Sequence, residues 1–539
     1  MWYCMDQKYL FITGGVVSSL GKGLTSAAIG MLLENQGLKV SMLKLDPYLN
    51  IDPGTMNPFE HGEVYVTDDG TETDLDLGHY YRMTNAKLSK LSNTTSGKIY
   101  NSVINRERKG EYLGKTVQVI PHITDEIKSH IRKVAEEELS NIIIVEIGGT
   151  AGDIESLPFL EAIRQFRLEQ PYNCLNIHLT YVPYLKAAQE LKTKPTQHSV
   201  QILREIGIIP DLILSRCEEA LSKEIKDKIS LFCSVRTDCV FDVPDIKTIY
   251  SLPLLFMSQR LDQKLLELWK ISYKNNDISD WKAFINKLEN PKLTIDIAVV
   301  GKYMQYKDAY KSLFEALQHA AVHEEFKLQL HLIESDKLSS NDNLQNYDGI
   351  LVPGGFGQRG FEGKITSCKI ARENKIPYFG ICLGMQVMAI EFARNVLSLE
   401  DANSTEMDPL TKHPVISLLS EQGILENLGG TMRLGSFCCE LKTSSLAHSI
   451  YKKQIIEERH RHRYEFNQSY KDLFEINGLI ISGSDIKRKL CEIVELQSHP
   501  FMLGVQFHPE FKSKPLIPHP LFIEFLKASA KNKKERING

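Results

Sequence analysis

The segment NIIIVEIGGT, residues 141–150, is the feature that most constrains the fold of this chain. Its apolar residues follow one another without the alternation of a half-exposed strand, so a strand formed here must be buried on both faces. Similar short β-branched runs, separated by segments with helical spacing, precede and follow it. This alternation predicts an α/β fold, with a mostly parallel sheet covered by helices on both faces.

The chain of 539 residues is too long for one ordinary core and suits two domains of about 250 residues each. The strand and helix pattern weakens across the polar segment 271–292 and restarts at Leu293. We therefore predict one domain over 1–270, a linker over 271–292 with a short helix around 281–288, and a second α/β domain over 293–539. The basic tail from Lys527 onwards is expected to be a frayed, solvated end.

Composition narrows the class of protein. Hydrophobic residues make up 42% and charged residues 24% of the chain, the balance of a soluble globular protein. No apolar run approaches the roughly 20 residues of a membrane span, and the first residues lack the pattern of a secretory signal, so a cytoplasmic location is expected. The ten cysteines show no CxxC pairs, which favours reduced thiols. The net charge of −4 gives no reason to expect nucleic acid as a partner.

A glycine-rich turn, GGVVSSLGKGLTS, follows the first expected strand and opens a helix expected from Leu24. Glycines let backbone N–H groups approach an anion, and the helix N-terminus adds a positive dipole end. Lys22 is placed to neutralise phosphate charge. The match to a standard phosphate loop is imperfect, because five residues separate Gly15 from Gly21 and Gly23 stands where Ser or Thr is usual. A plain tight turn is the alternative.

Two carboxylates are candidates to hold Mg²⁺ beside that turn. The segment 68–76 contains five acids in nine residues, which could equally be solvated charge, and Asp76 ends it. Glu146 lies near the carboxyl end of the apolar strand, where an acid is costly unless it is paired or bound to a metal. Because parallel sheets bind ligands at this edge, Asp76 and Glu146 are the predicted metal carboxylates.

Two further segments suit a polyanionic substrate. The KTKPTQ sequence carries Lys192 and Lys194 beside Pro195, with Thr196 and Gln197 as hydroxyl and amide donors, although in isolation it could be an ordinary surface loop. Asp153 and Glu155 follow the glycines after the buried strand. Carboxylates do not favour a triphosphate, so these two are expected to contact a ribose or a base.

The second half contains a nucleophile elbow. Cys382 lies between Gly380 and Gly384, after an expected strand and before an expected helix, which is the context of a strained turn with an oxyanion hole. Gly355, in the PGGFG sequence, could supply the second oxyanion donor. Far downstream, His508 and Glu510 stand two residues apart, on or just after a strand, and could point to the same side as base and orienting acid. These residues predict acyl transfer through a thioester.

The run Arg459–His460–Arg461–His462–Arg463 allows three interpretations. It could bind nucleic acid, form a solvated face, or recognise a substrate carboxylate, for which arginine is suited.

Several of these motifs resemble known families. PGGFG, GICLGMQ and QFHPE resemble the class I, triad-type glutamine amidotransferases. ITGGVVSSLGKG, the long segment KLDPYLNIDPGTMNPFEHGEVYVTDDGTETDLDLGHYYR, EIGGTAGDIES and KTKPTQHS resemble the CTP synthase family. The resemblance covers nearly the whole chain. It implies a P-loop-like, dethiobiotin-synthetase-like amidoligase domain followed by a class I glutaminase domain.

The resemblance also implies roles for individual positions. The catalytic residues would be Cys382, His508, Glu510 and Lys22, with Asp76 and Glu146 on Mg²⁺. The ATP site would contain Ser19, Leu20, Gly21, Lys22, Gly23, Leu24 and Asp76. The site shared by UTP and CTP would contain Ser18, Asp153, Ile154, Glu155, Lys192, Thr193, Lys194, Pro195, Thr196, Gln197 and Lys228. The glutamine site would contain Gly355, Leu383, Gly384, Met385, Gln386, Glu406 and Arg463.

Members of the family aminate UTP to CTP with ATP and glutamine, so the resemblance implies a C–N bond-forming ligase of pyrimidine biosynthesis. It further implies GTP as allosteric activator, CTP as feedback inhibitor, and a homotetramer that can form filaments. Three rival functions fit the sequence less well. An amidotransferase making GMP or carbamoyl phosphate would need a different first half. An ATP-dependent switch or partitioning protein would leave the triad unexplained. A polymer-forming protein with dead sites conflicts with the intact Lys22 and triad.

Overall fold

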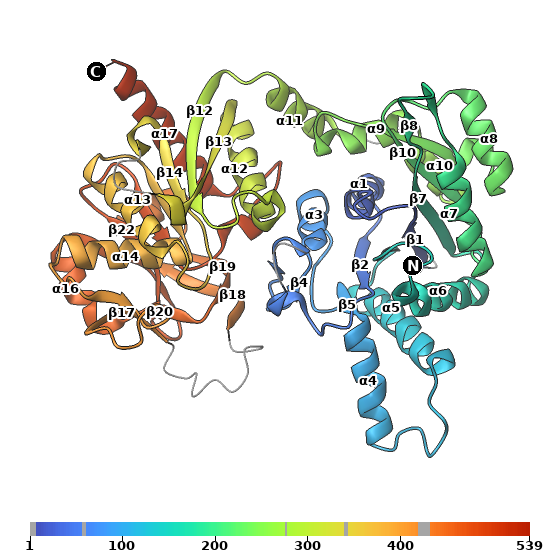
Figure 1. Ribbon diagram of the computed structural model, residues 1–539, viewed down its shortest axis with the longest axis horizontal. Coiled ribbons are helices and arrows are strands. Elements are labelled where there is room, and N and C mark those ends of the chain that lie inside the picture. Colours follow the sequence, from blue (N-terminus) through green and yellow to red (C-terminus); the bar gives the residue numbers. More distant parts are fainter. Residues whose placement is uncertain (1–6, 57–60, 275–276, 339–342, 419–431, 539) are drawn as a thin grey trace. The chain divides into compact units, whose positions relative to one another are not determined.

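The computed structural model describes residues 7–56, 61–274, 277–338, 343–418 and 432–538 (Figure 1). The chain forms two compact units, of which the first contains 1–52 and 76–282 and the second contains 53–75 and 283–539. The segment 53–75 thus packs with the second unit although it lies early in the sequence. The boundaries at 270 and 293 stay a prediction.

The first unit is built on a seven-stranded sheet in the order β11-β10-β7-β1-β6-β2-β5, with every neighbouring pair parallel. Its strands are β1 (Lys8–Gly14), β2 (Val40–Asp46), β5 (Asn93–Thr95), β6 (Ile142–Ile147), β7 (Cys174–Tyr181), β10 (Leu212–Cys217) and β11 (Val240–Pro244). The buried strand predicted from NIIIVEI is β6, completely buried. The short polar β5 and the edge strand β11 were not predicted.

Helices cover both faces of this sheet. The helices α1 (Lys22–Asn35), α3 (Asp76–Met83), α9 (Leu252–Ser258) and α10 (Leu261–Leu268) contact one another on one face. The helices α4 (Ser96–Arg108), α5 (Thr124–Glu138) and α6 (Leu157–Glu169) contribute to a hydrophobic cluster on the other. There, Tyr9 and Phe11 pack edge-on against Phe166. The remaining helices, α7 (Lys194–Glu205) and α8 (Lys223–Cys233), contact each other.

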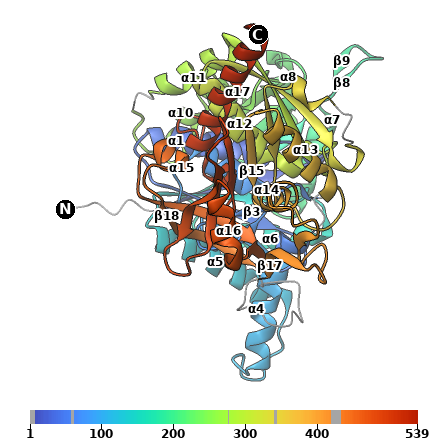
Figure 2. The same ribbon diagram turned by 90° about the vertical axis from the view of Figure 1, so that its left-hand side faces the viewer.

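Two parts of this unit extend away from the sheet. The far end of α4 does so in both views (Figures 1 and 2), and the short hairpin of β8 (Tyr184–Leu185) and β9 (Glu190–Leu191) stands out in Figure 2. The hairpin leads directly into the KTKPTQ segment. The predicted linker helix is α11 (Ser279–Glu289), where the Trp281 indole donates to the Tyr250 carbonyl over 2.7 Å.

The second unit is built on a nine-stranded sheet in the order β13-β12-β14-β15-β23-β22-β21-β18-β19. It is parallel from β13 to β23 and antiparallel beyond. Its strands are β12 (Leu293–Gly301), β13 (Phe326–Glu334), β14 (Gly349–Val352), β15 (Tyr378–Ile381), β18 (Arg433–Leu441), β19 (Ile455–His462), β21 (Leu479–Asp485), β22 (Cys491–Leu496) and β23 (Met502–Val505). The α/β class is confirmed in both units.

Two hydrophobic clusters fill the faces of this sheet. One includes α13 (Phe361–Glu373), α14 (Leu383–Asn395) and α16 (Lys471–Ile476). The other includes α12 (Lys311–His323), α15 (Leu446–Tyr451) and α17 (Pro520–Asn538). A three-stranded sheet of β16 (Ala402–Ser404), β17 (His413–Leu418) and β20 (Tyr464–Phe466) adds to this unit. None of the helices in the described residues is long and apolar enough to cross a membrane.

The expectation of a frayed C-terminus was wrong. Helix α17 continues to Asn538 (Figure 1). Lys533 lies 2.9 Å from Asp296 and 3.1 Å from Asp348, and Arg536 lies 2.6 Å from Asp348. Because Asp348 is fully buried, these basic residues neutralise a carboxylate of the core and hold the last turns of the helix.

Candidate functional sites

The glycine-rich turn connects β1 to α1 at the carboxyl edge of the first sheet. Gly21, with φ of +89°, has the left-handed backbone that favours glycine and immediately precedes α1. Lys22 is the first residue of the helix, and its ammonium donates to the Gly149 carbonyl over 2.6 Å. Burial and the neighbouring Lys44 lower the pKa of Lys22. The nearby carboxylates Asp46, Asp76 and Glu146 act in the opposite direction, so Lys22 lies within a cluster of mixed charge.

Gly23 explains why the turn departs from the standard phosphate loop. A Cβ atom added at Gly23 would collide with Oδ1 of Asp76, the first residue of α3. The position that usually carries a Ser or Thr hydroxyl is thus occupied here by a carboxylate from another helix. The absence of a hydroxyl at position 23 and the approach of Asp76 are therefore linked, because a side chain at position 23 would occupy the space of the carboxylate.

Lys44 holds the two predicted metal carboxylates together. Its ammonium contacts Oδ2 of Asp76, lies 2.8 Å from Oε1 of Glu146, and lies 3.9 Å from Asp46. Tyr80 donates its hydroxyl proton to the other oxygen of Glu146. Sequence reasoning missed Lys44, although a lysine within the buried strand VSMLKLD is itself a signal, because lysine is almost never buried unless it is paired.

The charges of this cluster are strongly perturbed. Burial raises the pKa of Glu146, against the attraction of Lys44. Burial also acts to raise the pKa of Asp76, but Lys44 and His79 outweigh it and the net pKa is lowered. Two carboxylates beside a phosphate loop suit Mg²⁺, which takes one or two protein carboxylates and completes its shell with phosphates and water. Within the described residues, no group of three or more metal-ligating side chains of His, Cys, Asp or Glu occurs.

The loop after β6 lies against the phosphate loop. The Ala151 N–H donates to the Gly14 carbonyl over 2.8 Å, and Gly152 lies close to Ile202 of α7. Asp153 accepts from the Thr150 N–H over 2.8 Å, and Ile154 is 79% exposed. The turns after β1 and β6 and helix α7 therefore lie near one another, as expected for a ligand edge.

The residues expected to bind UTP or CTP separate into two groups. Ser18, Lys192 and Lys228 are accessible, and Lys192 forms an ion pair with Glu190 of the hairpin. Thr196 and Gln197 are buried and have partners within the unit, namely the Tyr181 carbonyl at 3.1 Å and the Thr193 hydroxyl at 3.0 Å. In this structure the lysines are available to bind an anion, whereas Thr196 and Gln197 make internal hydrogen bonds that stabilise the start of α7.

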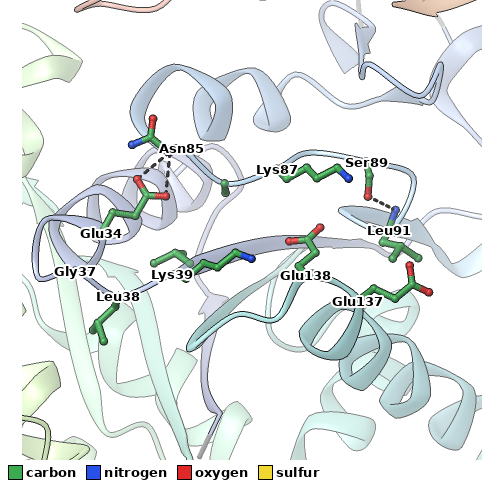
Figure 3. A pocket seen from close by; sticks show the side chains of 12 residues that line it. Glu34, Gly37, Leu38, Lys39, Asn85, Lys87, Ser89, Leu91, Glu137 and Glu138 are labelled. Carbon is green, nitrogen blue, oxygen red and sulfur yellow. Dashed lines mark hydrogen bonds between the residues drawn. The ribbon is translucent and has the colours of Figure 1, made fainter. Parts of the chain in front are cut away.

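A cavity of about 610 Å³ lies at the opposite edge of the first sheet (Figure 3). Lysine and glutamate side chains are mixed around it, and both oxygens of Glu34 accept from the Asn85 N–H, over 2.9 and 2.8 Å. The lining residues are Glu34, Gly37, Leu38, Lys39, Val40, Asn85, Ala86, Lys87, Ser89, Leu91, Glu137 and Glu138. Its mixed charge does not suit a triphosphate.

In the second unit, Cys382 forms the sharp turn between β15 and α14. Its φ of 51° and ψ of −102° are strained for a residue with a side chain. A Cβ atom on Gly380 would collide with the Gly384 backbone, and one on Gly384 would collide with the Val352 carbonyl. The two glycines of the motif are therefore required by close packing around the nucleophile.

His508 and Glu510 form the acid–base pair. Nδ1 of His508 lies 2.7 Å from Oε1 of Glu510, while Nε2 makes no hydrogen bond with any described residue. Burial opposes the charge of the imidazolium, but Glu510 and Cys382 raise the pKa of His508 to about 10. The two residues lie just after a strand and on the same side, as expected; β23 ends at Val505, and Pro509–Lys512 forms a 3-10 turn. The turn brings the acid to the ring.

The PGGFG loop faces the nucleophile across a cavity of about 310 Å³ that Cys382, His508, Glu510 and Gly355 line together. Lys302, directly after β12, donates to the carbonyls of Phe356 and Gly357 over 2.6 and 2.9 Å. The Gly357 N–H donates to Glu406 over 2.7 Å. A cation and a carboxylate thus fix the loop. Lys302 was not predicted, and its only signal is its position at the end of a parallel strand.

The other residues expected at the glutamine site lie around the nucleophile. Leu383, Gly384 and Met385 are buried in the first turn of α14. Gln386 donates to the Tyr464 carbonyl over 2.9 Å and to Gln506 over 3.2 Å, and Gln506 in turn donates to the Cys382 sulfur over 3.7 Å. Burial raises the pKa of Glu406, while the Gly357 N–H and the charges of Lys302 and Arg463 act in the opposite direction, so Arg463 lies within electrostatic reach of this carboxylate.

The basic run lies on β19 and its first two arginines have internal partners. Arg459 is 1% exposed and binds Asp68 over 2.7 Å, while Arg461 binds Glu72 over 2.8 Å. Their partners belong to segment 53–75, whose Gly54 and Glu63 also line the 310 Å³ cavity. The acids between Asp68 and Glu72 are thus largely committed to holding this segment on the second unit, rather than to solvent.

Comparisons with known proteins agree with this geometry. Residues 8–271 match the family model of the CTP synthase N-terminus, and residues 305–528 match that of class I glutamine amidotransferases. A CTP synthase of Protochlamydia amoebophila is 62% identical over 531 residues, covering 97% of this chain and 98% of the relative. One of Hydrogenobaculum is 57% identical, covering 98% and 99%.

Among solved structures, the glutaminase domain of Trypanosoma brucei CTPS with bound acivicin is 39% identical, with a TM-score of 0.42, and the match covers 44% of this chain and 94% of that one. The identity over nearly the full length of both curated relatives decides the assignment. The chain belongs to the CTP synthase family.

Proposed function

We propose that this protein aminates UTP to CTP in an ATP-dependent reaction, with ammonia released from glutamine at Cys382. It is a C–N bond-forming ligase of pyrimidine nucleotide synthesis, like its relatives. One observation carries the proposal: a single chain holds both a phosphate loop beside two carboxylates and a strained cysteine beside a His–Glu pair. A nucleotide-binding protein without amidotransferase activity would not need the second arrangement.

The second unit is arranged to release ammonia. The Cys382 thiolate attacks the side-chain carbonyl carbon of glutamine, and the N–H groups of Leu383 and Gly355 would bind the oxyanion. His508 gives its proton to the departing ammonia, while Glu510 fixes the ring. Water then hydrolyses the thioester and releases glutamate. Glu406 and Arg463, which carry opposite charges, suit the amino and carboxylate groups of the substrate.

The first unit is arranged for phosphoryl transfer. The γ-phosphoryl group of ATP moves to the 4-oxygen of the uracil ring, and ammonia then displaces phosphate at that carbon to give CTP. Lys22 neutralises phosphate charge at the start of α1. Asp76 and Glu146 would hold Mg²⁺, which when bound neutralises charge on the triphosphate. The accessible Lys192, Lys194 and Lys228 would contact the phosphates of UTP, and Asp153 and Glu155 its ribose or base.

Regulation and location belong to the same proposal. GTP is the expected activator and CTP the expected inhibitor at the UTP site, while the residues of a GTP site are not assigned. A homotetramer, with the capacity to form filaments, is the expected assembly. The nine cysteines of the described residues are all free thiols, which favours the cytoplasm. Ammonia must travel inside the protein, because water would protonate it.

The test is ultraviolet detection of CTP from UTP, ATP and Mg²⁺, with glutamine plus GTP in one reaction and ammonium in another. CTP in both reactions is expected. CTP formed with ammonium alone would support the proposed synthetase activity but contradict the coupled glutaminase. Glutamate release without CTP in either reaction would overturn the proposed product and favour another amidotransferase.

A further inference from the structure

Helix α13 carries a lysine that none of the steps above uses. Lys364 lies in the first turn of α13 and its side chain is completely buried. Its ammonium makes no hydrogen bond with any described residue. It lies behind the PGGFG loop, because a Cβ atom on Gly355 would be 3.5 Å from its Nζ and 3.6 Å from the Leu383 side chain. Lys364 therefore lies next to Gly355, one of the two residues whose N–H groups would bind the oxyanion, and Leu383, the other, also lies beside Gly355.

The contrast with Lys302 is informative. Lys302 uses its ammonium to bind two carbonyls of the loop, so its role is positional. Lys364 carries the same kind of group, but its amine has no hydrogen-bond partner in the part of the chain that the structure describes. A buried amine without a partner is destabilising, since its lost hydration is not replaced. A methionine or leucine would fill the same space more favourably, so packing alone does not account for a lysine here.

The charged groups around Lys364 come from three elements. Lys302 follows β12, Cys382 follows β15, and Glu406 follows β16. Burial and Lys302 lower the pKa of Lys364 to about 7, while Cys382 and Glu406 act in the opposite direction. Asp336, in the short turn packed against α13, acts on Lys302. Near neutral pH the charge of Lys364 therefore responds to charge at the nucleophile.

We propose that Lys364 is an electrostatic supporting residue of the glutaminase: its ammonium stabilises negative charge on the Cys382 sulfur and on the oxyanion at Gly355. It acts across the Gly355 peptide and does not touch the substrate, so it is a positioning residue and not a catalytic one. A cation in a region without water acts more strongly than one in solvent. This inference rests on the proposed glutaminase activity and adds a residue to it.

The test compares Lys364→Met with Lys369→Met, which makes the same change at an exposed position of the same helix. Cys382 is alkylated with iodoacetamide across pH, and its peptide is quantified by mass spectrometry. We expect the midpoint of the Lys364→Met profile to move to higher pH by about one unit. We expect kcat/KM for glutamine at pH 7 to fall about tenfold. Lys369→Met should match the wild type in both.

A higher midpoint would support the inference, because lost packing alone does not change thiol ionisation in this way. An unmoved alkylation midpoint in folded Lys364→Met would overturn the inference, whatever the activity of the variant. If that variant fails to fold, the alkylation profile of Cys382 in the wild type tests the inference instead. Its profile should contain a second inflection near pH 7 from Lys364, and a single smooth ionisation would contradict the role. CTP synthesis by the wild type with glutamine distinguishes failure of this inference from failure of the proposed glutaminase on which it rests.

Discussion

The two candidate sites of this protein are constructed differently. The cysteine site is nearly complete without a ligand, because a strained turn, two required glycines and a 2.7 Å His–Glu contact fix it locally. The phosphate edge is assembled from β1, β2, α3 and β6, and its carboxylates are occupied by Lys44. The difference teaches that local geometry fixes the cysteine site. At the phosphate edge, a ligand must instead change the ion pairs that its carboxylates already make.

The comparison predicts that the activities of the two sites can be separated by mutation. Cys382→Ala removes the nucleophile, so glutamine-dependent CTP synthesis should fall by more than about 10⁴-fold. Synthesis with ammonium should be retained, because the first unit is untouched. The measurement is CTP formation with each nitrogen source. Loss of both activities would mean that the cysteine turn supports the synthetase, and the separation would be wrong.

The charged site should respond to loss of one cation. Lys22→Met removes charge beside the phosphates, and CTP synthesis should fall about 10²- to 10³-fold with glutamine and with ammonium alike. Lys39→Met is the matched control, since Lys39 is exposed at the opposite edge of the same sheet (Figure 3). Equal losses in the two variants would indicate a general effect of charge rather than a phosphate contact.

The absence of a side chain at Gly23 is a sharper test of the assembled site. Gly23→Ala places a methyl group against Asp76 and should displace that carboxylate. We expect the Mg²⁺ concentration needed for half-maximal CTP synthesis to rise about tenfold. Glutaminase activity in the same preparation serves as the control for folding. An unchanged Mg²⁺ requirement would remove Asp76 from the metal site.

The smallest expected effect is on the stability of the cysteine site against pH. The pKa of His508 is raised from 6.5 to about 10, so its ion pairs stabilise the fold fully below pH 6.5 and are lost as pH rises through about 10. Glu510→Gln removes the strongest partner and should lose less stability over that interval than the wild type. Urea denaturation at both ends of the interval measures this. Parallel losses would contradict the raised pKa.

The sequence by itself determined the local parts of this protein. Apolar runs such as 142–147 have to form buried strands, and glycines flanking Cys382 have to form a tight turn, because both depend on neighbours within a few residues. The α/β class, the elbow and the family resemblance followed from such segments. The roles given to most of the nucleotide and glutamine residues stay predictions.

Only the tertiary structure decided which distant charges meet. Lys44 between Asp76 and Glu146, Lys302 on the PGGFG loop, Arg459 on segment 53–75 and the basic end of α17 on Asp348 were all missed or misinterpreted. Each joins residues far apart in the chain. A lysine or arginine looks solvated in a sequence, because the burial that makes its pairing obligatory is created only when the sheet and its helices close around it.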